Sequence, residues 1–304
     1  MIPANSPFHP DNDAAYQTWR AQKLAGYPQT GSALIVEIAN PAQLTDSEYA
    51  ALWQRIAKTQ MVIYATRMGE SEDKESIRAL AAQFGLTHLD ANWLADEDGI
   101  SSLTPQDDAG QARGEFIPYT HRPIRWHTDG YYNPRERRIW AMALHCVRAA
   151  DEGGVNDLYD HELAYITLRD TNPAHIRALM ADDAMTIPAR ADETGIARAD
   201  ESGPAFAVED GQLHLRYTAR TKSIAWKEDA ATQAAVATLE AHLASNPAGQ
   251  FSLRLEPGMG LLCNNVLHTR SGFNDRPEHR RLLYRARYHD HLRNLRTSPG
   301  SEKP

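Results

Sequence analysis

The sequence contains few cysteines: among its 304 residues only Cys146 and Cys263 occur, and neither belongs to a C-x-x-C pair. Two cysteines are too few for a disulfide framework in a chain of this length, so the fold must depend on a buried core that includes both thiols. Long apolar runs are also lacking, because none approaches the roughly 20 residues that span a bilayer. The first residues have neither a basic region nor an apolar stretch. These absences predict a cytoplasmic protein without a membrane partner.

The sequence also lacks a run of basic residues. It has 32 Lys and Arg against 40 Asp and Glu, which gives a formal net charge of -8 and a pI near 5.9. A protein that binds nucleic acid needs a basic stripe to neutralise the phosphate backbone. We therefore expect no nucleic-acid partner and predict that the ligand is a small molecule. A homo-oligomer is compatible with the sequence.

The order of apolar and polar segments predicts one domain over residues 31–293. Residues 1–30, with several Pro and Asn, are predicted to be an irregular lead-in, and residues 294–304 a disordered tail. Strands are expected at 34–38 and 61–64. Between them, a capping box of Thr45 and Glu48 begins a helix. Its buried face is predicted to contain Tyr49, Leu52, Trp53 and Ile56.

A second helix is expected to bury Ile77, Leu80, Ala81 and Phe84 and to end at Gly85. From about residue 115, short apolar segments separated by Pro, Gly and Asn are typical of a sheet-rich core. The clearest strands are 139–144, 251–255 and 261–263. Helices are expected at 161–181 and 229–245, and the polar segment 188–212 has no clear periodicity, so it is a candidate for a mobile lid.

The triplet His127-Thr128-Asp129 is a candidate metal-binding motif, because side chains two apart on a strand point to the same side. Two imidazoles and one carboxylate on one face leave open positions on a metal. The motif alone is weak, since 13 His and 40 acidic residues predict roughly two chance copies. His9-Pro10-Asp11 and His88-Leu89-Asp90 match it as well, but only His127 begins the sheet-rich region.

A distant pair of segments makes the motif specific. Residues 264–272 contain His268, and residues 280–285 contain Arg281. Together with residues 126–130, they resemble the taurine dioxygenase (TauD/TfdA) family of Fe(II)- and 2-oxoglutarate-dependent oxygenases, in the clavaminate synthase-like superfamily. In that family a His-x-Asp pair is followed more than a hundred residues later by His, and then by Arg. The resemblance extends from residue 34 to Tyr288.

The resemblance implies a fold, a site and a reaction. The fold would be mainly β with flanking helices (α+β), a double-stranded β-helix or jelly roll. The metal ligands for Fe(II) would be His127, Asp129 and His268. Arg281 would bind the distal carboxylate of 2-oxoglutarate, and Arg285 would contact the co-substrate or an acidic substrate. With O2, the expected reaction hydroxylates a C–H bond and releases succinate and CO2.

One position departs from the family pattern. Residues 152–157 resemble the Gly-Gly-acid-Thr segment whose Thr hydroxyl bonds the co-substrate, but Asn156 stands in place of the Thr. An amide can donate the same hydrogen bond. Asn156 is therefore assigned to the 2-oxoglutarate site.

Candidate substrate contacts surround these motifs. Tyr131 and Tyr132 follow the metal pair, and one of them could face the open metal positions or both could pack on the sheet rim. Arg216 and Arg220 are four apart, and with Arg270 they could hold a carboxylate, sulfonate or phosphate, or be ordinary surface charges. The predicted substrate is a small polar, anionic or amino-acid-like metabolite.

Two other classes of protein remain open. A cupin-like hydrolase or isomerase could use the same three ligands for zinc or manganese, and a non-catalytic barrel could bind a metabolite without turnover. Neither class requires Arg281. Oxygen-dependent formation of succinate distinguishes the oxygenase from both alternatives.

Overall fold

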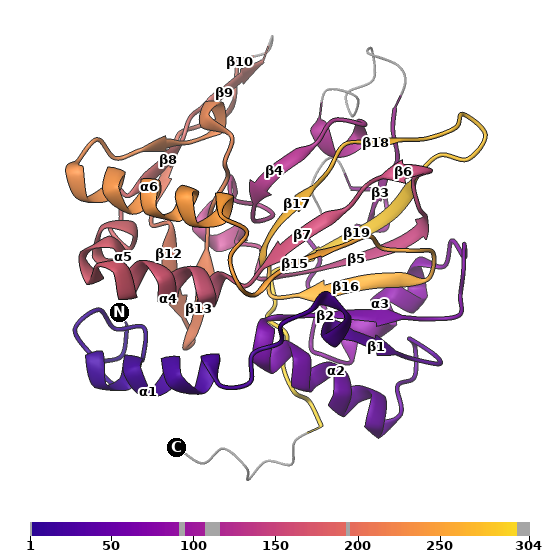
Figure 1. Cartoon of the computed structure of the whole chain (residues 1–304). Coiled ribbons are helices and arrows are strands. Elements are labelled where there is room, and N and C mark those ends of the chain that lie inside the picture. The colour runs from indigo at the N-terminus through magenta and orange to yellow at the C-terminus, as the bar shows by residue number, and fades with distance from the viewer. Residues whose placement is uncertain (1, 91–94, 107–115, 193–194, 297–304) are drawn as a thin grey trace.

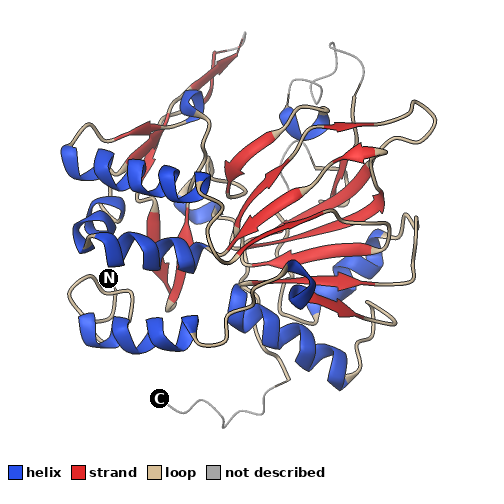
Figure 2. Cartoon of the chain, viewed as in Figure 1, coloured by secondary structure: helices blue, strands red, loops and turns tan. Residues whose placement is uncertain are grey.

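The computed structural model describes residues 2–90, 95–106, 116–192 and 195–296. Two β-sheets form the centre of the molecule, and helices lie on two sides of them (Figure 2). Most of the predicted tail, residues 297–304, and part of the segment predicted as a lid, residues 193–194, lie outside the described residues. The fold is thus a mixture of helices and sheets, as the sequence predicted.

The larger sheet has six strands in the order β1-β2-β16-β5-β19-β3. Only β1 and β2 are parallel; the other neighbours pair antiparallel. The strands are β1 (Ile35–Glu37), β2 (Met61–Ala65), β16 (Met259–Cys263), β5 (Ala141–Arg148), β19 (Leu282–Tyr288) and β3 (Ser101–Leu103). Side chains alternate between two buried faces, so strands such as β5 are almost continuously apolar.

The smaller sheet has four strands in the order β15-β7-β17-β4, all antiparallel. These strands are β15 (Gln250–Leu253), β7 (Asn156–Tyr159), β17 (Leu267–Arg270) and β4 (Ile124–His127). One apolar cluster joins the inner faces of both sheets, since Ile63 and Leu261 of the larger sheet belong to it together with Leu158 and Leu267 of the smaller one. Both cysteines are buried in this cluster as free thiols, as expected.

The outer face of the larger sheet is covered by α2 (Asp46–Thr59) and α3 (Lys74–Ala82) (Figure 1). The predicted capping box is present, because Thr45 Oγ1 accepts from the Glu48 amide and Glu48 Oε2 accepts from the Thr45 amide. Helix α3 ends at Ala82 rather than at the predicted Gly85, which lies in a turn with φ of +83°.

A second group of helices lies at the other end of the sheets. It consists of α1 (Asp13–Leu24), α4 (His161–Thr171), α5 (Pro173–Leu179) and α6 (Ala230–Ala244) (Figure 1). Short strands complete this part: β8 (Met185–Ile187) with β11 (Glu201–Gly203) and β14 (Ala225–Trp226), β9 (Arg190–Asp192) with β10 (Gly195–Arg198), and β12 (Phe206–Glu209) with β13 (Gln212–Leu215). A further pair, β6 (Glu152–Gly153) and β18 (Phe273–Asn274), lies at the far rim.

Two predictions about this region were wrong. The lead-in contains α1, which begins at the side-chain cap of Asn12 and buries Lys23 against Asp160 and Glu162 at 2.7 and 2.5 Å. The helix expected at 161–181 is divided in two, because Pro173 cannot continue α4 and instead begins α5.

The segment 188–212, which the sequence made a candidate for a mobile lid, contains short paired strands: β9 with β10, β11 with β8, and β12 with β13. Strands of three or four residues are too short to show a period in the sequence.

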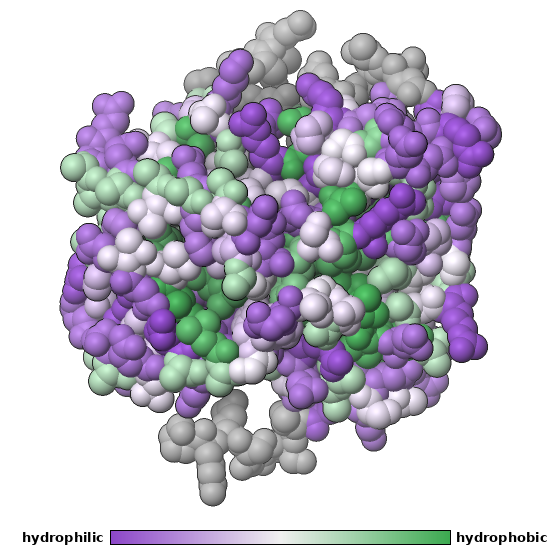
Figure 3. Space-filling view, viewed as in Figure 1, coloured by the Kyte–Doolittle hydropathy of each residue, from purple (hydrophilic) through white to green (hydrophobic). Residues whose placement is uncertain are grey.

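The surface in Figure 3 is mainly polar, with small apolar areas between charged side chains. A row of weakly apolar side chains follows the outer face of the alanine-rich α6 (Figure 3). No helix in the described part of the chain is both long and apolar enough to cross a membrane.

Candidate metal centre

Three predicted ligands meet where the smaller sheet pairs β4 with β17. His127 is the last residue of β4, Asp129 lies in the turn that follows, and His268 lies on β17 directly opposite His127. One ligand atom from each residue lies within 4.8 Å of the other two. Among the described residues, this is the one such cluster of His, Cys, Asp and Glu side chains.

Both imidazoles are oriented by their own strands. His127 Nδ1 lies 2.9 Å from the Arg125 carbonyl, and His268 Nδ1 lies 3.0 Å from the Val266 carbonyl. A carbonyl can only accept, so each Nδ1 carries the hydrogen and each Nε2 presents its lone pair. The two Nε2 atoms lie 3.6 and 3.9 Å from Oδ1 of Asp129. Burial lowers the pKa of His268 to about 3, so its imidazole is neutral, the state that binds a metal.

The turn that carries Asp129 is held by Asn265. The Asn265 side chain accepts from the Asp129 amide at 2.8 Å and donates to the carbonyls of Asp129 and Ile139 at 2.9 and 2.8 Å. Gly130 has a φ of +64°, and a Cβ there would lie 2.3 Å from Ile139 Cγ1. Only glycine therefore fits after the metal carboxylate, as the motif has it.

The surroundings of Asp129 keep its carboxyl group ionised, as the binding of a cation requires. Burial opposes ionisation of the carboxyl, but the nearby charge of Arg285, with that of Arg287, outweighs it and holds the pKa of Asp129 well below its usual range. Arg285 Nη1 lies 3.3 Å from Oδ2. Oδ2 itself is buried without a hydrogen bond. Two neutral imidazole nitrogens and one ionised carboxylate are the donor set that a divalent iron centre with open positions requires, so the residues fit that metal.

Arg281 is a buried cation whose guanidinium forms no ion pair with a described residue, although its backbone amide donates to Asp275 Oδ2 at 3.0 Å. Its side chain is 4% exposed and packs on the ring of Phe273, 4.9 Å away. No ion pair to its guanidinium is found within the part of the chain that the structure describes. Burial lowers the pKa of Arg281 to about 10, yet the group stays charged at neutral pH. A buried, unpaired guanidinium is costly, and an anionic ligand would compensate it.

Asn156 is the first residue of β7 and follows a glycine segment that passes Arg281. The position that a Cβ on Gly154 would take is 3.4 Å from Arg281 Nε, and Asn156 follows two residues later. The Asn156 side-chain amide donates to the Thr269 carbonyl at 2.7 Å, and its Oδ1 is buried without a partner. Since the NH2 group has two hydrogens, one remains to donate to a ligand.

Among the predicted substrate residues, Arg216 lies next to the segment that pairs with the end of β4. His127 pairs with Thr218, and the amides of Thr128 and Ala219 continue that antiparallel pairing. Arg216 lies two residues before Thr218, where the charges of Glu201 and Arg138 act on it. Its Nε donates to the carbonyl of Tyr131 at 3.1 Å, and its Nη2 is buried without a partner.

The other two arginines are separate from Arg216. Arg220 is exposed before a 3-10 helix at Thr221–Ser223. Arg270 was predicted to join a substrate anion, but its guanidinium instead donates to the backbone carbonyls of residues 117, 118, 120 and 122 at 2.5–3.4 Å. Its role is to hold that loop against β17, which corrects the prediction.

Tyr131 and Tyr132 contact each other edge to face, with ring centroids 5.3 Å apart. Tyr132 also accepts a hydrogen bond from Arg287 Nη1 at 2.9 Å. Both rings are partly exposed and pack against the inner apolar cluster. Trp126 packs there as well.

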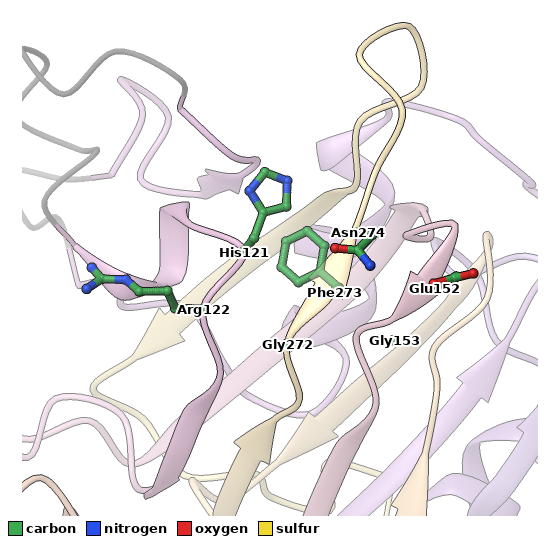
Figure 4. A pocket seen from close by; sticks show the side chains of 7 residues that line it. All are labelled: His121, Arg122, Glu152, Gly153, Gly272, Phe273 and Asn274. Carbon is green, nitrogen blue, oxygen red and sulfur yellow. The ribbon is translucent and has the colours of Figure 1, made fainter.

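A surface hollow of about 490 Å³ adjoins the rim of the sheets but not the metal ligands. It is lined by His121, Arg122, Glu152, Gly153, Gly272, Phe273 and Asn274 (Figure 4). In Figure 4 the His121 and Phe273 rings lie together on one side of it. Phe273 contacts both His121 and Arg281, so its ring lies between the hollow and the predicted co-substrate arginine.

Sequence reasoning missed three residues that support the centre: Asn265, Asp90 and Arg287. Asn265 lay in a motif already noted, and its φ of +47° is one that Asn tolerates better than most residues. No local pattern marked the partnership of Asp90 and Arg287, because it depends on the pairing of segments far apart in the chain.

A two-sheet fold with two histidines and a carboxylate on one face is the architecture of non-haem iron oxygenases. The model of the taurine catabolism dioxygenase TauD, TfdA family matches residues 21–287. The chain therefore belongs to this family of non-haem iron dioxygenases, whose members use Fe(II) and 2-oxoglutarate.

Individual relatives agree with this family. A uridine-5'-phosphate dioxygenase from Amycolatopsis sp is 31% identical over 168 residues, which cover 54% of this chain and 60% of that protein. The chain thus spans less than two thirds of that relative. The non-haem iron oxygenase OrfP has a TM-score of 0.59 at 15% identity, over 95% of this chain and 92% of that one. A taurine dioxygenase from Burkholderia xenovorans has a TM-score of 0.54 at 20% identity, over 84% and 88%. These structures show a shared fold.

Proposed function

We propose that this protein hydroxylates a C–H bond of a small polar metabolite with an anionic group, using Fe(II), 2-oxoglutarate and O2. The observation that carries the proposal is the triad of His127, Asp129 and His268 beside a buried, unpaired Arg281. A hydrolase or a simple binding protein would need the metal ligands but not a second buried cation.

Each group has a proposed role. His127, Asp129 and His268 hold iron, and Arg281 with Asn156 binds the distal carboxylate of 2-oxoglutarate. Arg285, whose guanidinium lies against Asp129, would contact the co-substrate or the anionic substrate. Iron, when bound, supplies the oxygen-activating chemistry by which one oxygen atom enters the substrate and the other enters succinate as CO2 leaves. The protein orients the reactants and excludes water.

We further propose that the two sheets form a double-stranded β-helix. The shared apolar cluster between a six-stranded and a four-stranded sheet supports this architecture. A cytoplasmic location and a homo-oligomeric state stay predictions from the sequence.

The anionic group of the substrate is assigned to Arg216. Arg216 is 5% exposed, its Nε donates to the Tyr131 carbonyl in the turn that follows the metal pair, and its Nη2 is buried without a partner. A Cβ on Gly203 would lie 2.7 Å from Arg216 Nη1, so glycine leaves room for the guanidinium. A relative that acts on uridine-5'-phosphate is consistent with an anionic substrate, as is an amino-acid-like one with its carboxylate.

The test is formation of succinate under O2 with Fe(II) and 2-oxoglutarate, in the presence of uridine-5'-phosphate, uridine or free amino acids. Succinate formation that an anionic compound stimulates and its neutral analogue does not would support the proposal. Arg216→Gln should raise KM for that anionic compound about 10-fold or more, because a charge-assisted contact is lost. Arg220→Gln, an exposed arginine of the same segment, is the matched control. Absence of succinate with all of these compounds in the metal-replete protein would contradict the proposed substrate class.

A further inference from the structure

Asp90, Arg287 and Tyr132 form a buried chain of contacts behind the metal centre. Arg287 Nη2 lies 2.5 Å from Asp90 Oδ2, and Arg287 Nη1 donates to the Tyr132 hydroxyl at 2.9 Å. The side chains of Asp90 and Arg287 are 0% and 4% exposed. The sequence pattern had marked Asp90 only as part of a rival His-x-Asp triplet.

The chain of contacts is fixed by the backbone of β19. The Asp90 amide donates to the Arg287 carbonyl at 2.8 Å, and Leu89 pairs with Tyr288 in an isolated antiparallel β-bridge. Arg285 and Arg287 are two apart on β19, so both side chains point to the metal side of the sheet. Arg285 contacts Asp129, whereas Arg287 contacts Tyr132.

Tyr132 lies in the same tight turn as the metal carboxylate. The turn begins at Asp129, and the Asn133 amide closes it by donating to the Gly130 carbonyl at 2.8 Å. Asn265 holds the start of the turn through the Asp129 backbone. The hydroxyl of Tyr132 connects the other end to Arg287. One end of the turn is therefore tied to the loop between β16 and β17, and the other end to β19.

We propose that Arg287, held by Asp90, is a positioning residue that fixes the turn of residues 129–132 through Tyr132 and so sets the position of Asp129 for metal binding. An arginine suits this role because its planar fork donates to two partners at once. Asp90 forms an ion pair with Arg287 and a second one, at 2.8 Å, with the half-exposed Arg137. This inference rests on the metal centre proposed above.

The experiment measures the affinity of the apo-protein for Co(II) and, without oxygen, for Fe(II), by titration. Tyr132→Phe removes only the hydroxyl and should weaken metal binding about 10-fold, the lower end of effects seen for outer-shell partners of metal ligands. Tyr131→Phe makes the same change in the neighbouring ring, whose hydroxyl has no hydrogen bond among the described residues, and should leave the affinity unchanged.

A second pair of variants separates positioning from folding. Arg287→Lys keeps the charge but cannot reach both partners well, so its affinity should lie between wild type and Tyr132→Phe. The double variant Asp90→Asn with Arg287→Gln removes both buried charges together and avoids leaving either unpaired. It should weaken metal binding as Tyr132→Phe does, and adding Tyr132→Phe to it should have no further effect.

The outcomes distinguish this inference from the proposed function. Failure of the wild type to bind metal would overturn both. Tight binding by the wild type with an unchanged affinity in Tyr132→Phe would overturn the positioning role alone. Additive losses in the triple variant would show that Arg287 and Tyr132 act independently and would also contradict it.

Discussion

His127 and His268 face each other across adjacent antiparallel strands, with their ring centroids 4.1 Å apart. Each ring is turned by a hydrogen bond from its Nδ1 to a carbonyl two residues earlier on its own strand. The metal site is thus part of the regular pairing of the smaller sheet. Only Asp129 depends on a turn, and it is there that the supporting contacts of Asn265 are concentrated.

Replacing Asn265 tests that support. Asn265→Gly keeps the backbone freedom that a φ of +47° requires but removes three hydrogen bonds, while Asn265→Ala removes the same bonds and adds strain. We expect a loss of roughly 2–4 kcal/mol in unfolding free energy for Ala and somewhat less for Gly. Urea unfolding measures both. Equal stability of wild type and Asn265→Gly would show that these hydrogen bonds do not hold the turn.

Replacing Arg281 tests the co-substrate site. Arg281→Lys keeps a charge but loses the two-pronged contact with a carboxylate, and Arg281→Gln loses the charge as well. The 2-oxoglutarate concentration at half saturation should rise about 10-fold for Lys and more for Gln. Arg276→Gln is the matched control, since Arg276 forms an exposed ion pair with Asp151. If the 2-oxoglutarate concentration at half saturation were unchanged in both Arg281 variants, the distal carboxylate would have to bind at another residue.

His145 predicts a pH dependence of stability. It is buried in β5, where Tyr64 lies within hydrogen-bond distance, and burial lowers its pKa to about 4. Between that value and the ordinary pKa near 6.5, the unfolded chain binds a proton that the folded chain does not, so stability falls as the pH drops through this range. Between pH 7 and pH 5 the loss due to His145 should be about 2 kcal/mol.

The measurement is urea unfolding at the two pH values for wild type and His145→Gln. The amide does not titrate, so the variant should lose about 2 kcal/mol less than wild type on acidification. Equal losses in the two proteins would mean that His145 is protonated in the folded state.

The sequence predicted the metal ligands because each lies in a local motif with a fixed geometry. The period of two on a strand is sufficient to set His127 beside Asp129, and the spacing to His268 and Arg281 needed only a family pattern. The order of the sheets was not predictable in the same way, since β16 lies between β2 and β5 although it follows them by more than a hundred residues.

Where sequence reasoning failed, the missing information was tertiary. Helix α1 buries Lys23, a residue that looks exposed until its partners on α4 are known. From the sequence, Arg270 could bind a substrate anion. Only the structure shows that its guanidinium donates to backbone carbonyls of the loop before β4. Arg216 and Arg270 could be told apart only once their partners were in place.

The most direct test of the account is anaerobic addition of Fe(II) and 2-oxoglutarate to the purified protein, observed through the weak visible charge-transfer band of the chelate. The account predicts a band in wild type that is absent in His268→Ala and that needs more 2-oxoglutarate in Arg281→Lys. A metal-replete wild type without the band, or a band that persists unchanged in His268→Ala, would contradict it.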